Sequence, residues 1–188
     1  LNGMFALAFY DMQRRVLLLA RDAVGVKPLY ALIDRRGLFF ASQYDQLLAH
    51  TWAAGLAVTP AALGLYLRLG YVPAPYAIMQ GTTLLEPGGW LEATADGRVT
   101  RGRYYTFPVY QEPDLRGAEA NEAVDAAVAA AVRRQMVSDV PLGAFLSGGI
   151  DSPLVAAKAA AASNRPLQAF TIGSDDEGLD EPADAQAY

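Results

Sequence analysis

The 188-residue chain contains no cysteine. This absence excludes disulfide bonds, cysteine-based metal sites and a cysteine nucleophile within the sequence. It fits a protein of a reducing compartment, and we expect a cytoplasmic location.

Long apolar runs and positive charge are also scarce. Arg, Asp or Gly interrupts each apolar run well before the roughly 18–20 residues that a membrane span needs, and no basic-then-apolar secretory signal is visible. The net charge of −5 argues against a general nucleic-acid binder, which usually carries a basic stripe. We therefore expect neither a membrane nor a nucleic acid as partner.

What the chain does contain suffices for a folded core. Hydrophobic residues make up 53 % and charged residues 19 % of the sequence, which is not the profile of a disordered chain. The chain opens at Leu1 in a strand-like run and stops at Tyr188 soon after a predicted strand. We read it as a piece of a longer protein.

Strand signals dominate the first hundred residues. Short apolar runs separated by polar turns predict three hairpins and one further strand. The expected strands are 5–10, 16–20, 29–33, 38–41, 83–86 and the two halves of 91–105. Short helices are expected over 44–50 and from Pro60 to about Leu69, with Thr59 as the N-cap.

The composition then changes. Segment 107–117 holds two prolines and several charges without periodicity, which predicts a linker. Residues 118–137 are alanine-rich, with an apolar side chain at every fourth position, which predicts a helix whose stripe packs in a core. The stripe is Val124, Val128, Val132 and Met136. A strand, a glycine turn, a helix and a second strand are expected over 142–146, 147–151, 152–162 and 167–172, the opening of a parallel α/β sheet.

The turn reads Ser-Gly-Gly-Ile-Asp-Ser over 147–152, between a predicted buried strand and a helix. The first N–H groups of a helix lack partners and carry the positive end of its dipole, so a phosphate placed there gains several hydrogen bonds. Gly148 and Gly149 would let the backbone approach the anion and adopt angles that other residues resist. The hydroxyls of Ser147 and Ser152 would add donors.

Asp151 repels a bare phosphate but suits Mg²⁺ bound to that phosphate. The alternative for the whole segment is a structural glycine turn capped by serine. A lone Gly-Gly would favour that alternative, whereas the complete hexapeptide after a buried strand favours phosphate binding. Neither a Walker loop nor a dinucleotide fingerprint is present.

Residues 138–152 resemble the PP-loop of the ATP pyrophosphatases, in the form found in glutamine-dependent asparagine synthetases. Further segments resemble the glutaminase domain of that family in the same order along the chain. They are 1–8, Arg21-Asp22 with Gly25, 27–30 and 40–42. Because the matches cover nearly the whole chain, it is identified as similar to a piece of a glutamine-hydrolysing asparagine synthetase.

The resemblance implies an α+β glutaminase domain of the N-terminal-nucleophile (Ntn) type with layered β-sheets over 1–106, and a linker over 107–117. Residues 118–188 would then start an α/β parallel-sheet PP-loop domain of the adenine nucleotide α-hydrolase-like kind. The implied enzyme is a carbon–nitrogen ligase. It forms asparagine from aspartate and glutamine-derived ammonia through β-aspartyl-AMP, and releases AMP and pyrophosphate. ATP and Mg²⁺ are the implied cofactors, aspartate and glutamine the implied substrates, and a homodimer is a candidate assembly.

The same resemblance assigns the site. The residues expected to bind ATP and pyrophosphate are Leu146, Ser147, Gly148, Gly149, Asp151, Ser152 and Ile172, with Asp151 contacting Mg²⁺ through pyrophosphate. The backbones of Leu146 and Ile172 would lie near the adenosine. Pro153 stands where the family often has serine. Because proline is tolerated in the first helical turn, we expect the loop to survive with one donor fewer.

Other residues leave alternatives open. The glutaminase nucleophile of the family is an N-terminal cysteine, so no catalytic residue is assigned here, and we expect the chain alone to make no asparagine. Arg21 and Asp22 are either functional residues near a domain interface or structural turn contacts. The acidic run 175–181 is either a solvated loop or a contact for metal or substrate.

Two further functions compete with the asparagine synthetase hypothesis. Related ligases close β-lactam or lasso-peptide rings or amidate other carboxylates. An N-terminal cysteine in the full-length gene would favour glutamine use, and its absence would favour a cyclase. The chain could instead be a non-catalytic remnant whose loop binds nucleotide or nothing, which MgATP binding by wild type and Gly149→Asp would decide.

Overall fold

The computed structural model describes residues 1–112 and 114–173. The chain divides into two compact units, Leu1–Val109 and Tyr110–Tyr188. The division falls within the segment 107–117 that the sequence predicts as a linker. The acidic run 175–181 lies outside the described residues.

The first unit is built on two antiparallel sheets. The larger has the order β1-β2-β6-β7, and the smaller has the order β4-β3-β5. The strands are β1 (Ala6–Asp11), β2 (Val16–Arg21), β3 (Tyr30–Asp34), β4 (Gly37–Ala41), β5 (Thr82–Leu84), β6 (Gly89–Thr94) and β7 (Val99–Arg103). These bounds confirm the three predicted hairpins. The further strand, expected over 83–86, is β5, which begins one residue earlier and ends two residues earlier than expected.

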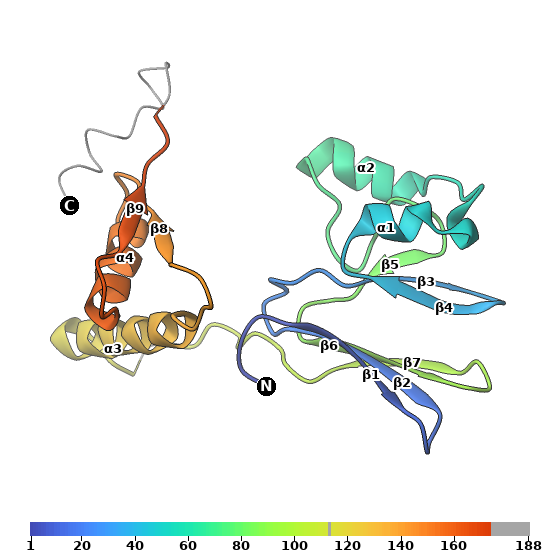
Figure 1. Ribbon diagram of the computed structural model, residues 1–188, viewed down its shortest axis with the longest axis horizontal. Coiled ribbons are helices and arrows are strands. Elements are labelled where there is room, and N and C mark those ends of the chain that lie inside the picture. The colour runs from blue at the N-terminus through green and yellow to red at the C-terminus, as the bar shows by residue number, and fades with distance from the viewer. Residues whose placement is uncertain (113, 174–188) are drawn as a thin grey trace. The chain divides into compact units, whose positions relative to one another are not determined.

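The sheets are layered because successive side chains along a strand point to opposite faces and both faces of these strands carry apolar residues. Leu19 and Leu91 pair across β2 and β6 and belong to a core with Leu29 and Leu85, which Ile33 of the smaller sheet also contacts. The neighbouring residue, Leu32, faces the other way, into a second core with Leu47 and Ala53. Figure 1 shows the result, in which α1 and α2 lie beyond the smaller sheet.

Three short helical elements cover this side. They are α1 (Tyr44–Ala49), the 3₁₀ turn η1 (Thr51–Ala53) and α2 (Pro60–Leu69). As predicted, α2 starts with Pro60, and it ends where Gly70 adopts a left-handed φ of 78° and donates its N–H to the Tyr66 carbonyl at 2.8 Å. Thr59 is the N-cap residue, as predicted, but its side chain makes no capping hydrogen bond.

The second unit contains α3 (Gly117–Gln135), β8 (Gly143–Phe145), α4 (Asp151–Ala162) and β9 (Gln168–Phe170). The order of elements agrees with the sequence prediction, and β8 pairs with β9 in parallel, with Phe145 opposite Phe170. α4 packs against α3 and β8. Among the helices described in either unit, none has the length and apolar character that a membrane span requires.

Burial in the second unit differs from the expectation. No residue of α3 is buried and Val124 is 59 % exposed, so the predicted core stripe is wrong. β8 was expected to be buried, yet Phe145 is 73 % exposed. The physical reason is that, in the described part of this unit, α4 is the one helix packed on α3, and β9 is the one strand beside β8.

Candidate functional site

The loop 147–150 joins β8 to the start of α4, and the helix start is open. α4 begins at Asp151, and no side chain caps it. Among the described residues, the amide N–H groups of Asp151 and Ser152 donate to no acceptor. Pro153, which is buried, has no N–H to leave unpaired. The helix therefore forms with Pro153 in its first turn, as expected, and presents two free donors.

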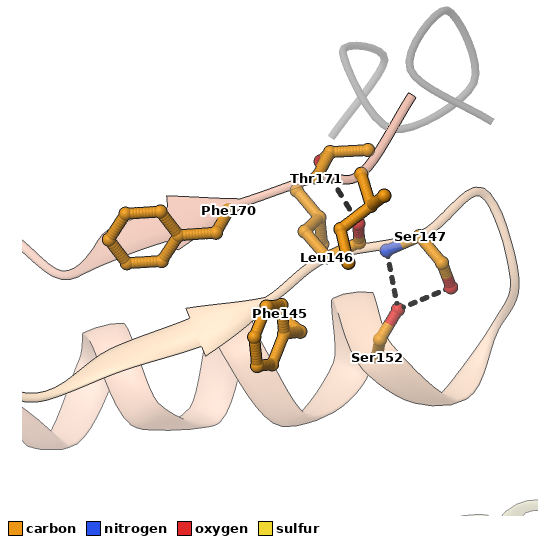
Figure 2. Close-up of a pocket in the computed structure, with 7 residues that line it drawn as sticks. Phe145, Leu146, Ser147, Ser152, Phe170 and Thr171 are labelled. Atoms are coloured by element: carbon orange, nitrogen blue, oxygen red, sulfur yellow. Dashed lines mark hydrogen bonds between the residues drawn. The ribbon is translucent and has the colours of Figure 1, made fainter. Parts of the chain in front are cut away.

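A pair of serines closes the loop (Figure 2). The Oγ of Ser152 accepts the N–H of Ser147 at 2.9 Å, and the two hydroxyl oxygens lie 2.8 Å apart. Only one hydroxyl proton is needed for the bond between them, so the other is free to be donated to a ligand oxygen. The Gly149 N–H also points back to Ser147 Oγ, at 3.4 Å. The loop is thus held by its own short contacts around an open helix start.

A hollow of about 280 Å³ adjoins the serine pair. Its lining consists of Phe145, Leu146, Ser147, Ser152, Phe170, Thr171 and Ile172. The backbone of Leu146 is engaged on both sides, because its N–H donates to the Phe170 carbonyl at 2.8 Å and its carbonyl accepts the Thr171 hydroxyl at 2.9 Å. A carbonyl oxygen has a second lone pair, so Leu146 can still accept one bond from a ligand.

The structure brings together part of the predicted set. Leu146, Ser147, Ser152 and Ile172 line the hollow. Gly148, Gly149 and Asp151 lie in the loop and at the helix start, outside that lining. Sequence reasoning missed Phe145, Phe170 and Thr171 as lining residues. The two phenylalanines could have been predicted, because each lies near the carboxyl end of a strand and the two strands were expected to be parallel. The carboxyl ends of parallel strands meet at one edge of the sheet.

The expected role of Gly149 needs correction. Its φ is not in the left-handed region, and an added Cβ would meet only Ser147 Oγ, at an ordinary 3.5 Å. Backbone angle therefore does not require glycine at position 149 in the structure. What glycine supplies there is open space in front of the helix start.

The charge around the loop is sparse. Asp151 is exposed, and no group of three or more metal-ligating side chains occurs among the described residues. One carboxylate suits Mg²⁺ only if phosphate oxygens and water complete the coordination, which is a common arrangement for this ion. Farther along α4, Lys158 pairs with Asp125 of α3 at 2.5 Å. That pair holds the helix rather than the loop.

Asp22 and Arg21 in the first unit make structural turn contacts, one of the two roles expected for them. The Asp22 carboxylate is fully buried and accepts the N–H groups of Val26 at 2.9 Å, Lys27 at 2.9 Å and Phe5 at 3.3 Å. Burial by itself would raise the pKa of Asp22, but these hydrogen bonds, with a contribution from Gly25, lower it below the usual value. The carboxylate ties the start of β1 to the turn after β2.

The Arg21 guanidinium also binds backbone groups of this turn, as a donor where Asp22 is an acceptor. It donates to the carbonyls of Lys27 at 2.7 Å, Gly25 at 2.6 Å and Leu85 at 2.6 Å. The Arg21 carbonyl in turn accepts the Tyr104 hydroxyl at 2.8 Å. The two side chains therefore hold residue Phe5, the turn 25–27 and residue Leu85 together, and the Arg21 backbone adds Tyr104.

Comparison with known proteins yields two family matches. Residues 1–105 match the glutamine amidotransferase domain model, and residues 123–188 match the asparagine synthase model. One match lies in each unit, and their order agrees with the order of segments seen in the sequence.

Several curated proteins are similar over most of the chain. Asparagine synthetase [glutamine-hydrolyzing] 1 of Bacillus subtilis (strain 168) is 32 % identical over 96 % of this chain and 28 % of its own length. A putative asparagine synthetase of Mycobacterium tuberculosis (strain ATCC 25618 / H37Rv) is 35 % identical over 96 % of the chain and 28 % of its own length. A solved glutamine phosphoribosylpyrophosphate amidotransferase from B. subtilis aligns with a TM-score of 0.28 at 16 % identity, over 97 % of this chain and 36 % of that one. These sequence matches confirm the resemblance, and the chain spans less than a third of the length of the two synthetases.

Proposed function

Because this chain belongs to the glutamine amidotransferase domain family, we propose that it works within a glutamine-dependent, amide-forming ligase of the asparagine synthetase type. The observation that carries the proposal is the open start of α4 behind the Ser-Gly-Gly-Ile-Asp-Ser loop. In this assignment the first unit belongs to an Ntn-type glutaminase, and the second unit opens a PP-loop synthetase domain.

The loop would hold the pyrophosphate part of ATP. The free N–H groups of Asp151 and Ser152 point out of a helix start, where the dipole favours an anion. Ser147 and Ser152 add a hydroxyl donor, and the space at Gly148 and Gly149 admits the phosphate oxygens. Asp151 would contact Mg²⁺ through these oxygens, and the ion would neutralise charge on the leaving pyrophosphate.

The adjoining hollow would receive the adenosine. It lies on the β9 side of the loop, where Leu146 keeps one carbonyl lone pair and the exposed Ile172 follows the strand. The exposed rings of Phe145 and Phe170 line the same hollow and offer apolar surface to a base. A nucleotide seated in this way would have its phosphates over the helix start.

The reaction then needs positioning more than protein nucleophiles. A carboxylate oxygen of aspartate attacks the α-phosphorus, the bond to the β-phosphate oxygen breaks, and pyrophosphate leaves. Ammonia next attacks the acyl carbon of the β-aspartyl-AMP and releases AMP. Donors fixed where negative charge develops accelerate such steps without moving, and the described loop supplies donors of that kind.

An assay of pyrophosphate release tests the proposal in the complete gene product. With MgATP, aspartate and ammonia, we expect pyrophosphate and asparagine in equal amounts. Ser152→Ala should slow release, whereas Ser163→Ala, at the far end of α4, should not. Release with a different carboxylate substrate would assign the chain to a related amide-forming ligase, a cyclase included. A product that neither releases pyrophosphate nor binds MgATP would be a non-catalytic remnant, and the proposal would be wrong.

A further inference from the structure

The backbone pairing of β8 with β9 stops at the edge of the hollow. β8 ends at Phe145 and β9 at Phe170, and the Phe170 carbonyl still accepts the Leu146 N–H at 2.8 Å. Because hydrogen bonds recur evenly along a parallel pair, the next one would run from the Ile172 N–H to the Leu146 carbonyl. Both residues are described in the structure, and they do not form this bond. Leu146 and Ile172 instead line the hollow.

The Thr171 hydroxyl takes the place of the missing bond (Figure 2). Its Oγ1 donates to the Leu146 carbonyl at 2.9 Å. A side-chain hydroxyl close to the main chain can offer a backbone group an alternative to a ladder bond. Ile172 is 77 % exposed, and its N–H donates to no acceptor in the described part of the chain. The Thr171 bond is therefore accompanied by a free backbone donor at the next residue.

The hollow consequently offers one backbone donor and one backbone acceptor from two paired strand ends. The donor is the Ile172 N–H. The acceptor is the Leu146 carbonyl, whose second lone pair is left after the bond from Thr171. In a continued ladder these two groups would bind each other, and the donor would not be open to a ligand.

Adenine carries the complementary groups along one edge. Its amino group donates, and each of the two ring nitrogens that flank the amino group accepts. Guanine has a carbonyl oxygen in place of the amino group. Guanine would therefore set an acceptor against the Leu146 carbonyl, which is unfavourable because neither oxygen can donate.

We propose that Thr171 is a positioning residue that makes the hollow selective for adenine, an inference that rests on the function proposed above. Its hydroxyl binds the Leu146 carbonyl and thereby keeps the Ile172 N–H out of the ladder. The free N–H donates to a ring nitrogen of the base, and the Leu146 carbonyl accepts from the amino group. Thr171 acts through these two backbone groups and makes no hydrogen bond to the base.

Isothermal titration of the complete gene product tests this role with MgATP and two analogues, 1-deaza-ATP and 7-deaza-ATP. Each analogue has a CH group in place of one ring nitrogen beside the amino group. We expect the wild type to bind one analogue about tenfold more weakly than MgATP, because the Ile172 N–H loses its acceptor. Thr171→Val, which has nearly the same shape but no hydroxyl, should bind MgATP about tenfold more weakly and that analogue no worse than MgATP. Thr171→Ser, which keeps the hydroxyl, should restore the wild-type ratio.

Magnesium pyrophosphate separates this role from a merely structural one. Its proposed contacts lie in the loop and at the start of α4, so Thr171→Val should bind it as the wild type does, whereas a damaged fold would weaken pyrophosphate and MgATP together. The inference would be overturned if Thr171→Val kept the wild-type ratio of MgATP to analogue, if Thr171→Ser behaved like Thr171→Val, or if the wild type bound both analogues as tightly as MgATP. Each of these results would leave the proposed function standing. A wild type that binds neither MgATP nor pyrophosphate would contradict both.

Discussion

The two units of this chain differ in how they hold their residues in place. Of the fourteen buried hydrophobic residues, thirteen belong to Leu1–Val109, and Ala159 is the one in the described part of the second unit. The first unit is therefore held by apolar cores between layers. The candidate site in the second unit is held by hydrogen bonds among Leu146, Ser147, Ser152, Phe170 and Thr171 in a largely exposed frame.

Charge separates the two units as well. The first has ten basic and seven acidic residues, whereas the second has five basic and thirteen acidic ones. The loop proposed to bind pyrophosphate thus lies in the acidic unit, where the overall field repels anions. The affinity of the loop for pyrophosphate must therefore come from local hydrogen-bond donors and a bound cation. Single substitutions in the loop should then change this affinity strongly.

The largest effect is expected at Asp22. Asp22→Asn replaces a buried carboxylate that accepts three backbone N–H groups, so it should lower the free energy of unfolding of the first unit by about 3–5 kcal/mol. Urea unfolding followed by tryptophan fluorescence measures this unit alone, because both tryptophans, Trp52 and Trp90, belong to it. Asp34→Asn, at an exposed pair with Arg36, is the control and should cost under about 1 kcal/mol. Equal losses would show that the Asp22 contacts do not organise the unit.

A matched pair of truncations sharpens the contrast in burial. Leu91→Ala empties a fully buried position and should cost about 2–5 kcal/mol in the first unit. Val124→Ala on the exposed side of α3 should change stability by less than about 0.5 kcal/mol. Calorimetric unfolding of each variant provides the comparison. A large loss at Val124 would mean that a surface covers α3 in solution.

The acid limit of the first unit should depend on Asp22. The pKa of the Asp22 carboxyl is lower in the folded protein than in the unfolded chain, where it is about 3.9. Its stabilising contribution is therefore complete above that value and is lost as the pH falls through the folded pKa. Urea midpoints measured from pH 6 downwards should drop for the wild type and drop less for Asp22→Asn. Parallel curves would assign the acid sensitivity to other carboxylates, such as Asp34 and Asp96, whose pKa values are also lowered.

The smallest effect concerns the serine pair. Ser152→Ala removes the acceptor of the Ser147 N–H and one hydroxyl, so MgATP binding should weaken roughly five- to tenfold, equivalent to about 1 kcal/mol. Isothermal titration of the wild type, Ser152→Ala and Ser163→Ala measures it, with the last expected to equal the wild type. An unchanged affinity for Ser152→Ala would remove the serine pair from the site.

Local signals in the sequence predicted most of the fold. Short apolar runs and the polar turns between them placed the hairpins of the first unit, and Pro60 marked the start of α2, because these features depend on neighbouring residues. The contact from Arg21 to Leu85 could not be predicted, since it joins residues 64 positions apart. Burial of the α3 stripe was predicted wrongly, because periodicity identifies an apolar face but not whether anything covers it.

The sequence motif predicted where the candidate site lies but only part of its geometry. The motif identified the serines and the helix start. It did not indicate that Thr171 binds the Leu146 carbonyl, because that bond depends on the pairing of β8 with β9. The expectation that Gly149 needs a backbone conformation other residues resist was wrong, because its φ does not lie in the left-handed region.

Binding of MgATP and of magnesium pyrophosphate to Gly149→Asp tests the central claim most directly. Because the structure has room for a Cβ at Gly149 and no positive φ there, this variant should fold and differ only by a negative charge before the helix start. Ala160→Asp adds the same charge at an exposed position near the other end of α4. The account predicts that wild type and Ala160→Asp bind both ligands and that Gly149→Asp binds neither. Equal binding by all three proteins, or none by the wild type, would contradict it.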